Sequence, residues 1–84
     1  MDNSFMSTVE VRFFAAARAA AKTDQMHLPA GTLNQILATL TANTELARVV
    51  PQCSFLVNAV ICHDFEAPIA AGSQIDVLPK FAGG

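Results

Sequence analysis

The sequence is short of charge. Only 14% of its 84 residues are charged and 52% are hydrophobic, whereas about 25% of the residues of an average soluble domain are charged. A chain of this length forms one small domain with a single core, and such a domain leaves much of its surface exposed. We therefore expect an exposed apolar patch, which usually marks the binding site of a protein partner, and a stable hetero-complex.

Basic residues and long apolar runs are also scarce. The five Lys and Arg residues are scattered, and the formal net charge is −2, whereas a nucleic-acid interface needs clustered basic residues. No apolar run is long enough to span a membrane, and the opening stretch MDNSFMSTVE lacks the basic and apolar regions of a signal peptide. These absences predict a cytoplasmic protein that binds neither nucleic acid nor membrane.

Cysteine and histidine are too few for a disulfide framework or a metal site. Cys53 and Cys62 should be free thiols in a reducing compartment, where a buried structural role is expected of them. Together with His63 they do not match the spacing of a structural zinc site, and His27 is far away in the sequence. We expect no bound metal and no activated thiolate.

A glycine-rich phosphate loop is absent as well. The four glycines, Gly31, Gly72, Gly83 and Gly84, lie in two turns and at the end of the chain, whereas a phosphate loop gathers its glycines in one short stretch. Paired carboxylates and a nucleophile with its base are also missing. The chain should therefore bind no cofactor, and any chemistry has to take place at its end.

The sequence does contain a clear pattern of strands and helices. Apolar and polar residues alternate in TVEVRFF, as in a half-buried strand, and apolar residues recur at helical spacing over residues 33–40. Thr32 and Gln35 stand at the spacing of a capping box, and Thr44 is a candidate N-cap for a further turn of helix. The predicted strands are 8–14, 24–28, 54–62 and 74–79, and the predicted helices are 15–22, 32–40 and 45–50.

This order of elements predicts an α+β fold, a mixed sheet with one main helix packed on one face. The first two strands are expected to pair like a hairpin, and Phe13 is expected in the core. We expect a disordered leader over residues 1–7, one domain over residues 8–79 and a flexible tail over residues 80–84. Because the last strand runs directly into the tail, the tail should leave from the edge or end of the sheet.

The tail ends in two glycines, which suits a particular chemistry. The terminal carboxylate of Gly84 is ionised near neutral pH, with a pKa of roughly 3.3 to 3.7. If another enzyme holds it in line with the α-phosphate of ATP, an acyl-adenylate forms, from which a sulfur or nitrogen nucleophile displaces AMP. Gly83 and Gly84 have no Cβ, so they fit a channel too narrow for other residues.

The stretches VRFFAAAR, VNAV, PIAAGSQIDVLP and LPKFAGG resemble the small subunits of molybdopterin synthase, the MoaD-type sulfur carriers of the MoaD/ThiS family. The resemblance extends from about Thr8 to Gly84 and implies a ubiquitin-like β-grasp fold. It implies that Gly84 is adenylated by an E1-like enzyme that uses ATP and is then converted to a thiocarboxylate. The sulfur would pass to cyclic pyranopterin monophosphate in molybdenum cofactor biosynthesis.

The resemblance also implies partners and residue roles. The chain would form a hetero-oligomer, a heterotetramer, with the large subunit of the synthase. Gly83 and Ala82 would thread the channel of the partner, while Phe81, Lys80 and Phe14 would contact the partner protein. One difference concerns the end of the first helix, where the family often has a glycine and this chain has Lys22.

Three other interpretations stay open. The first is a sulfur carrier for the thiazole ring of thiamin, although such chains tend to lack the Ala-rich helix at 15–22. The second is a protein modifier whose Gly84 is joined to lysines of target proteins. The third, of a different class, is an interaction domain with an inert tail.

Overall fold

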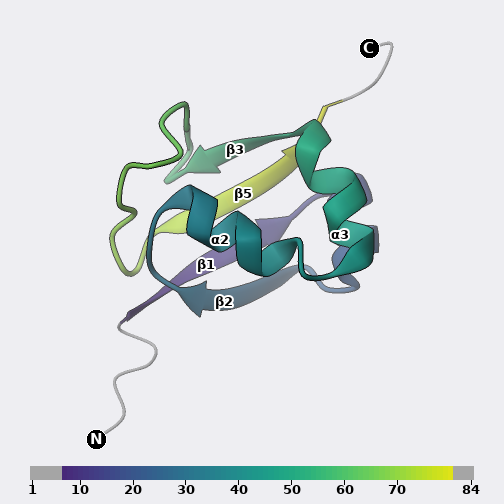
Figure 1. Cartoon of the computed structure of the whole chain (residues 1–84), viewed down its shortest axis with the longest axis horizontal. Coiled ribbons are helices and arrows are strands. Elements are labelled where there is room, and N and C mark those ends of the chain that lie inside the picture. Colours follow the sequence, from purple (N-terminus) through teal and green to yellow (C-terminus); the bar gives the residue numbers. More distant parts are fainter. Residues whose placement is uncertain (1–6, 81–84) are drawn as a thin grey trace, which may run out of the picture.

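The computed structural model describes residues 7–80, which form five strands and a set of short helices (Figure 1). The first strand and the last strand fall where the apolar alternation predicts them. The elements are β1 (Thr8–Phe13), α1 (Ala15–Ala21), β2 (Gln25–Pro29), α2 (Leu33–Leu40), α3 (Thr44–Val49), the 3-10 helix η2 (Val50–Gln52), β3 (Cys53–Val57), β4 (Val60–Ile61) and β5 (Gln74–Pro79).

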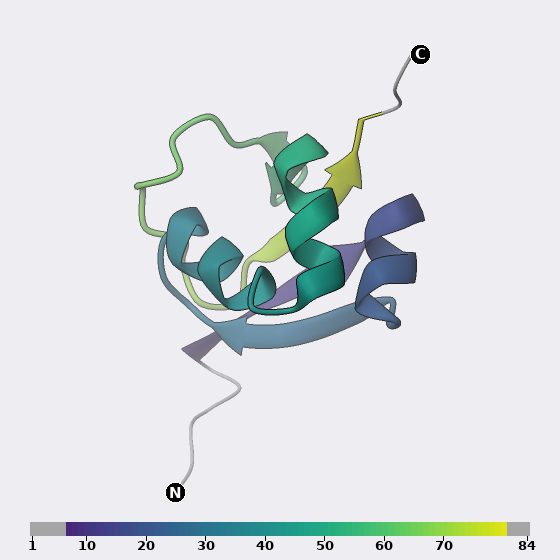
Figure 2. The same ribbon diagram turned by 45° about the vertical axis from the view of Figure 1, so that its right-hand side comes forward.

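The strands form one mixed sheet in the order β2-β1-β5-β3-β4. The last strand, β5, lies in the middle, parallel to β1 and antiparallel to β3. β1 and β2 pair antiparallel, which confirms the predicted hairpin-like pairing. The helices α2 and α3 cross one face of the sheet, and α1 packs against α3 (Figures 1 and 2). The predicted α+β fold, with its main helix on one face of a mixed sheet, is confirmed.

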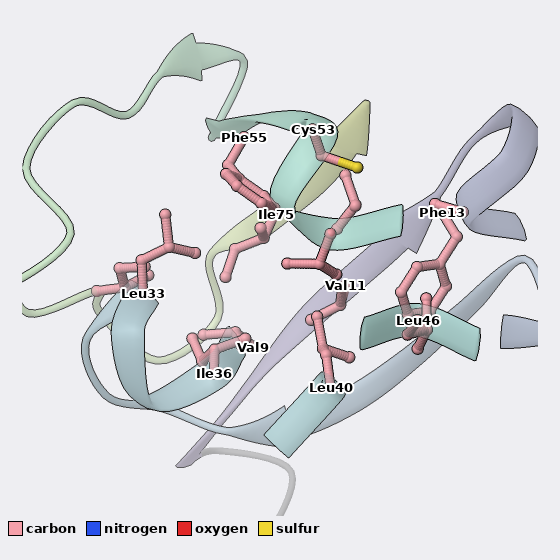
Figure 3. Packing of buried hydrophobic residues seen from close by; sticks show 14 residues of the cluster. Val9, Val11, Phe13, Leu33, Ile36, Leu40, Leu46, Cys53, Phe55 and Ile75 are labelled. Carbon is pink, nitrogen blue, oxygen red and sulfur yellow. The ribbon is translucent and has the colours of Figure 1, made fainter. Parts of the chain in front are cut away.

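The core lies between this face of the sheet and the helices (Figure 3). Alternate residues of β1 point into it, and Phe13 is 2% exposed, as predicted. Burying a side chain of this size stabilises the fold by about 1.5–3 kcal/mol. The other buried apolar residues are Val9, Val11, Ala17, Leu33, Ile36, Leu40, Leu46, Val50, Cys53, Phe55, Ile69, Ile75 and Val77.

The start of α2 confirms the predicted capping box. The hydroxyl of Thr32 accepts a hydrogen bond from the N–H of Gln35 at 3.2 Å, and the side-chain oxygen of Gln35 accepts one from the N–H of Thr32 at 2.9 Å. Two backbone donors that no helical carbonyl reaches are thereby satisfied. The cap fixes where α2 begins, so that its apolar stripe faces the sheet.

The start of α3 differs from the prediction by one residue. The N-cap is Asn43, not Thr44, because the side-chain oxygen of Asn43 accepts from the N–H of Glu45 at 2.8 Å and from that of Leu46 at 3.1 Å. Asparagine is among the best N-cap residues. Thr44 is the first residue of the helix itself, and the side chain of Leu46 is buried against the core.

The predicted strand 54–62 is wrong in one respect, because the chain turns back within it. Asn58 and Ala59 have φ angles of 50° and 70°, and β3 and β4 pair antiparallel on either side of them. Positive φ at both central residues is the geometry of a type I′ hairpin turn. Asn58 is held in place by its own backbone and side chain, which exchange hydrogen bonds with the backbone of Gln74 and the hydroxyl of Ser73.

Candidate functional site

The tail begins at the end of the central strand. β5 is hydrogen-bonded to neighbours on both sides: the N–H of Phe14 donates to the carbonyl of Val77 at 3.3 Å, and the N–H of Lys80 donates to that of Gln52 at 2.9 Å. The sheet therefore fixes the position of Lys80. The predicted reactive residue Gly84, the predicted tail-threading residues Ala82 and Gly83, and the predicted partner-binding residue Phe81 lie outside the described residues.

The two other predicted partner residues lie on either side of this end of β5. Lys80 lines a hollow of about 240 Å³ next to β3, together with Ser54 and His63. Phe14, half-buried, lines a hollow of about 280 Å³ next to β1, together with Arg18. Because β1 and β5 run parallel, Phe14 and the start of the tail lie at the same end of the sheet. The sequence could not place them together, since 66 residues separate them.

The sheet face opposite the helices carries no helix among residues 7–80, and we call it the open face. One row of side chains crosses it from strand to strand: Gln25, Arg12, Asp76, Leu56 and Ile61.

Leu78, two residues after Asp76 and nearer the tail, points to the same face. Leu56, Ile61 and Leu78 form the open-face patch, in which Ile61 is 49% exposed. Leu56 and Leu78 are half-buried, so the patch is partly exposed.

An ion pair lies beside this patch. Arg12 Nε donates to Asp76 Oδ1 at 2.9 Å, and Arg12 Nη2 donates to Asp76 Oδ2 at 3.2 Å. The hydrogen bond to Asp76 is the largest effect and raises the pKa of Arg12 above its ordinary value. Desolvation, the next largest effect, lowers this pKa, and the negative charges of Asp76 and Glu10 raise it. Asp76 is 7% exposed, and both of its carboxylate oxygens accept hydrogen bonds from Arg12.

Neither cysteine is disulfide-bonded, as predicted. Cys53 is 8% exposed, and its thiol donates to the carbonyl of Val49 at 3.3 Å. Burial raises the pKa of Cys53, which keeps the thiol neutral and unreactive. Cys62 is half-buried at the edge of the sheet, and its thiol donates to the carbonyl of Asp64 at 3.4 Å.

The described part of the chain contains no group of three or more His, Cys, Asp or Glu side chains that could hold a metal ion. Within the same residues, every buried side-chain nitrogen and oxygen has a hydrogen-bond partner. No helix between residues 7 and 80 is long and apolar enough to cross a bilayer.

Sequence reasoning missed Arg12, Asp76 and the leucines of the open-face patch. The alternation of β1 and β5 does indicate that Arg12 and Asp76 point away from the core. The alternation does not give the register between two strands that are 64 residues apart. That register is what brings Arg12 and Asp76 together as a pair. The run that contains Leu56 is apolar on both faces, which is typical of a strand covered on both sides or of one whose second face awaits a partner, so the sequence alone does not separate these two cases.

Comparison with known proteins places this arrangement in a family. The model of the ThiS family matches residues 11–84. Among solved structures, a chain in the complex of subunits 1 and 2 of molybdopterin-converting factor from Helicobacter pylori 26695 is 27% identical. The alignment covers 92% of this chain and 99% of that chain, with a TM-score of 0.73. Among curated proteins, none matches this chain significantly.

Two further solved structures support the fold. The small archaeal modifier protein 1 from Methanosarcina acetivorans is 24% identical over 94% of this chain and 98% of its own, with a TM-score of 0.81. The HVO 2177 protein from Haloferax volcanii is 22% identical over 100% of this chain and 92% of its own, with a TM-score of 0.80. At these identities the likeness extends to the fold alone.

The central parallel pair, the flanking hairpins and the helices on one face define a ubiquitin-like β-grasp domain, as the resemblance implies. Because the family model matches most of the chain, up to and including Gly83 and Gly84, the chain belongs to the ThiS family. It is a ubiquitin-like sulfur carrier of the ThiS/MoaD type.

Proposed function

We propose that this chain is the sulfur-carrier subunit of a molybdopterin synthase. The proposal rests on the family match that runs through Gly84. The molybdenum branch is favoured by the 27% identity to a chain from the complex of the two subunits of molybdopterin-converting factor. The Ala-rich helix α1, which thiazole carriers tend to lack, also favours it.

The proposed chemistry takes place at the carboxylate of Gly84. An E1-like enzyme positions this carboxylate against the α-phosphorus of ATP, so that a P–O bond forms and pyrophosphate leaves. A sulfur nucleophile then attacks the acyl carbon, AMP leaves with the bonding electron pair, and a thiocarboxylate results. The thiocarboxylate sulfur then attacks a carbon of cyclic pyranopterin monophosphate inside the large subunit, the C–O bond at that carbon breaks and its oxygen leaves, and a thioester joins the two molecules. Hydrolysis of the acyl–sulfur bond returns the Gly84 carboxylate and leaves the sulfur on the pterin.

The scaffold would supply docking and position. Phe14 and Lys80 lie on either side of the end of β5 from which the tail leaves, and Leu78 of the open-face patch is close to that end. A large subunit that takes up the tail and extends over the open face would cover them together. We assign Phe81 to anchoring the tail, and Ala82 and Gly83 to the narrow part of the channel. The complex would be a hetero-oligomer, a heterotetramer, in the cytoplasm.

The experiment is intact-mass spectrometry after incubation with ATP, the E1-like enzyme and a sulfur source. We expect one oxygen-for-sulfur exchange, located at Gly84, which is lost when Gly84 is deleted. An unchanged mass in the presence of an active enzyme would favour the inert interaction domain. Attachment of Gly84 to target lysines would favour the protein modifier. If the untagged chain co-purifies with a thiazole synthase instead of a large synthase subunit, the thiamin branch replaces the molybdenum branch.

A further inference from the structure

The side chain of Arg12 is held rigidly on the open face. Asp76 accepts from both Nε and Nη2. With its amide oxygen directed at Arg12, Gln74 accepts from Nη2 at 2.9 Å and donates to Oε1 of Glu10 at 3.3 Å. The guanidinium carbon also lies 5.5 Å from the ring centroid of Phe14, a cation–π distance. A side chain fixed by three neighbours loses little further freedom when a partner binds.

One guanidinium nitrogen of Arg12, Nη1, takes no part in the hydrogen bonds to Asp76 and Gln74. An arginine side chain has five N–H donors, of which Nε and Nη2 use three on Asp76 and Gln74. For the two donors of Nη1 the described residues supply no acceptor. The Arg12 side chain is 40% exposed, so these donors face water in the free domain.

The position of Arg12 on the open face determines whether the N–H donors of Nη1 become buried in a complex. In the row of side chains across the sheet, Asp76 lies between Arg12 and Leu56. Leu78 and Phe14 lie nearer to the tail. A protein that covers the open-face patch and takes up the tail therefore covers Arg12 too. A donor buried without an acceptor weakens binding, so the partner has to offer an oxygen atom at this point.

The charges around Arg12 determine which kind of oxygen atom on the partner can best accept the hydrogen bond from Nη1. The positive charge of Arg12 is already balanced by Asp76, and Glu10 adds a second negative charge through Gln74. A carboxylate from the partner would be repelled by both acidic groups as well as attracted by Arg12. A neutral carbonyl oxygen accepts the hydrogen bond without that repulsion.

We propose that Arg12 determines which partner docks on the open face, by donating from Nη1 to a neutral carbonyl oxygen of the large subunit. The contact would lie beside the apolar contacts of Leu56, Ile61 and Leu78 in the interface. This inference rests on the proposed function, because it takes the large subunit as the occupant of the face. A partner that is wholly apolar or acidic at this point binds less tightly.

The test measures the affinity of the full chain for its large subunit by titration calorimetry. The double variant Arg12→Leu/Asp76→Leu removes the donors without leaving a charge unpaired. We expect its affinity to fall about tenfold or more, since a hydrogen bond from a charged donor is lost and the partner oxygen is left unpaired. The matched control is Arg48→Leu/Glu45→Leu, which removes an ion pair of 3.8 Å on α3 and should leave the affinity unchanged.

Three results would count against the inference. Equal or tighter binding of the Arg12/Asp76 double variant would overturn it. If the loss caused by that variant disappears at high salt, the partner group is a carboxylate, and the neutral acceptor is wrong. If the double variant does not fold by circular dichroism, Arg12→Lys takes its place, because lysine keeps the charge but not the fork of donors. Unchanged affinity of Arg12→Lys would then overturn the inference.

Measurements on the wild-type chain distinguish failure of this inference from failure of the proposed function. A wild-type chain that gains sulfur at Gly84 and binds the large subunit supports the proposed function whatever Arg12 does. A wild-type chain that does neither overturns both.

Discussion

Replacing Ile61 by alanine should weaken binding of the large subunit by a predictable amount. Ile61 is 49% exposed in the free domain. Full burial of such a side chain is worth about 1.5–3 kcal/mol, so covering the exposed half on docking contributes about 0.8–1.5 kcal/mol. Alanine loses most of this, and the dissociation constant should rise about four- to twelvefold.

The neighbouring residue provides the control. Val60 is 67% exposed, more than Ile61, but it pairs with Val57, whose side chain packs against the core side of the sheet. Successive side chains of a strand point to opposite faces. Val60→Ala should therefore leave the affinity unchanged within about twofold by calorimetry. An equal loss for both variants, or a loss for Val60→Ala alone, would refute docking on the open face.

Three further predictions concern the stability of the domain. Lys22 ends α1 with φ 61°, a left-handed conformation that costs a residue with a side chain about 1–2 kcal/mol. Glycine relieves this strain but loses about 0.5–1 kcal/mol of backbone entropy on folding. Lys22→Gly should therefore raise the thermal midpoint by several degrees, whereas Lys22→Ala should not. Leu46→Ala should lower the free energy of unfolding in urea by about 2–5 kcal/mol, because Leu46 is 1% exposed in the core, and a loss below 1 kcal/mol would contradict the packing. Burial raises the pKa of Cys53 in the folded state. The contribution of the neutral thiol to the free energy of unfolding is therefore complete below the pKa of the unfolded thiol and falls as the pH rises above about 8.5. This alkaline loss of stability should be smaller in Cys53→Val, measured by urea unfolding at pH 7 and 10.

The elements that could be predicted from the sequence are those whose signals are local. The alternation of Val9, Val11 and Phe13, the helical stripe that begins at Leu33, and the capping box of Thr32 each depend on residues within one or two turns of each other. Local patterns of this kind fix which face of a strand or helix is buried. That was enough to indicate the fold class and the core.

The features that were missed depend on contacts between distant residues. The turn at Asn58 and Ala59 lacks the glycine that usually marks it, and Asn58 is held there by Ser73 and Gln74, 15 and 16 residues further on. The pairing of Asp76 with Arg12 likewise joins two strands that are distant in the sequence. No single stretch of sequence contains either interaction, so the apolar run predicted one long strand, and alternation indicated only that Asp76 points away from the core.

The place of β5 in the sheet explains how one small domain can serve both docking and delivery of the tail. β5 is bonded to β1 on one side and to β3 on the other as far as Lys80. Fraying of the edge strands β2 and β4 therefore leaves the position of Lys80 unchanged. Under the proposed function, docking would depend in part on an edge strand, through Ile61, whereas sulfur loading would depend on the carboxylate of Gly84. Substitutions on β4 should accordingly change affinity for the large subunit while leaving the position of the tail, and the geometry of its activation, intact.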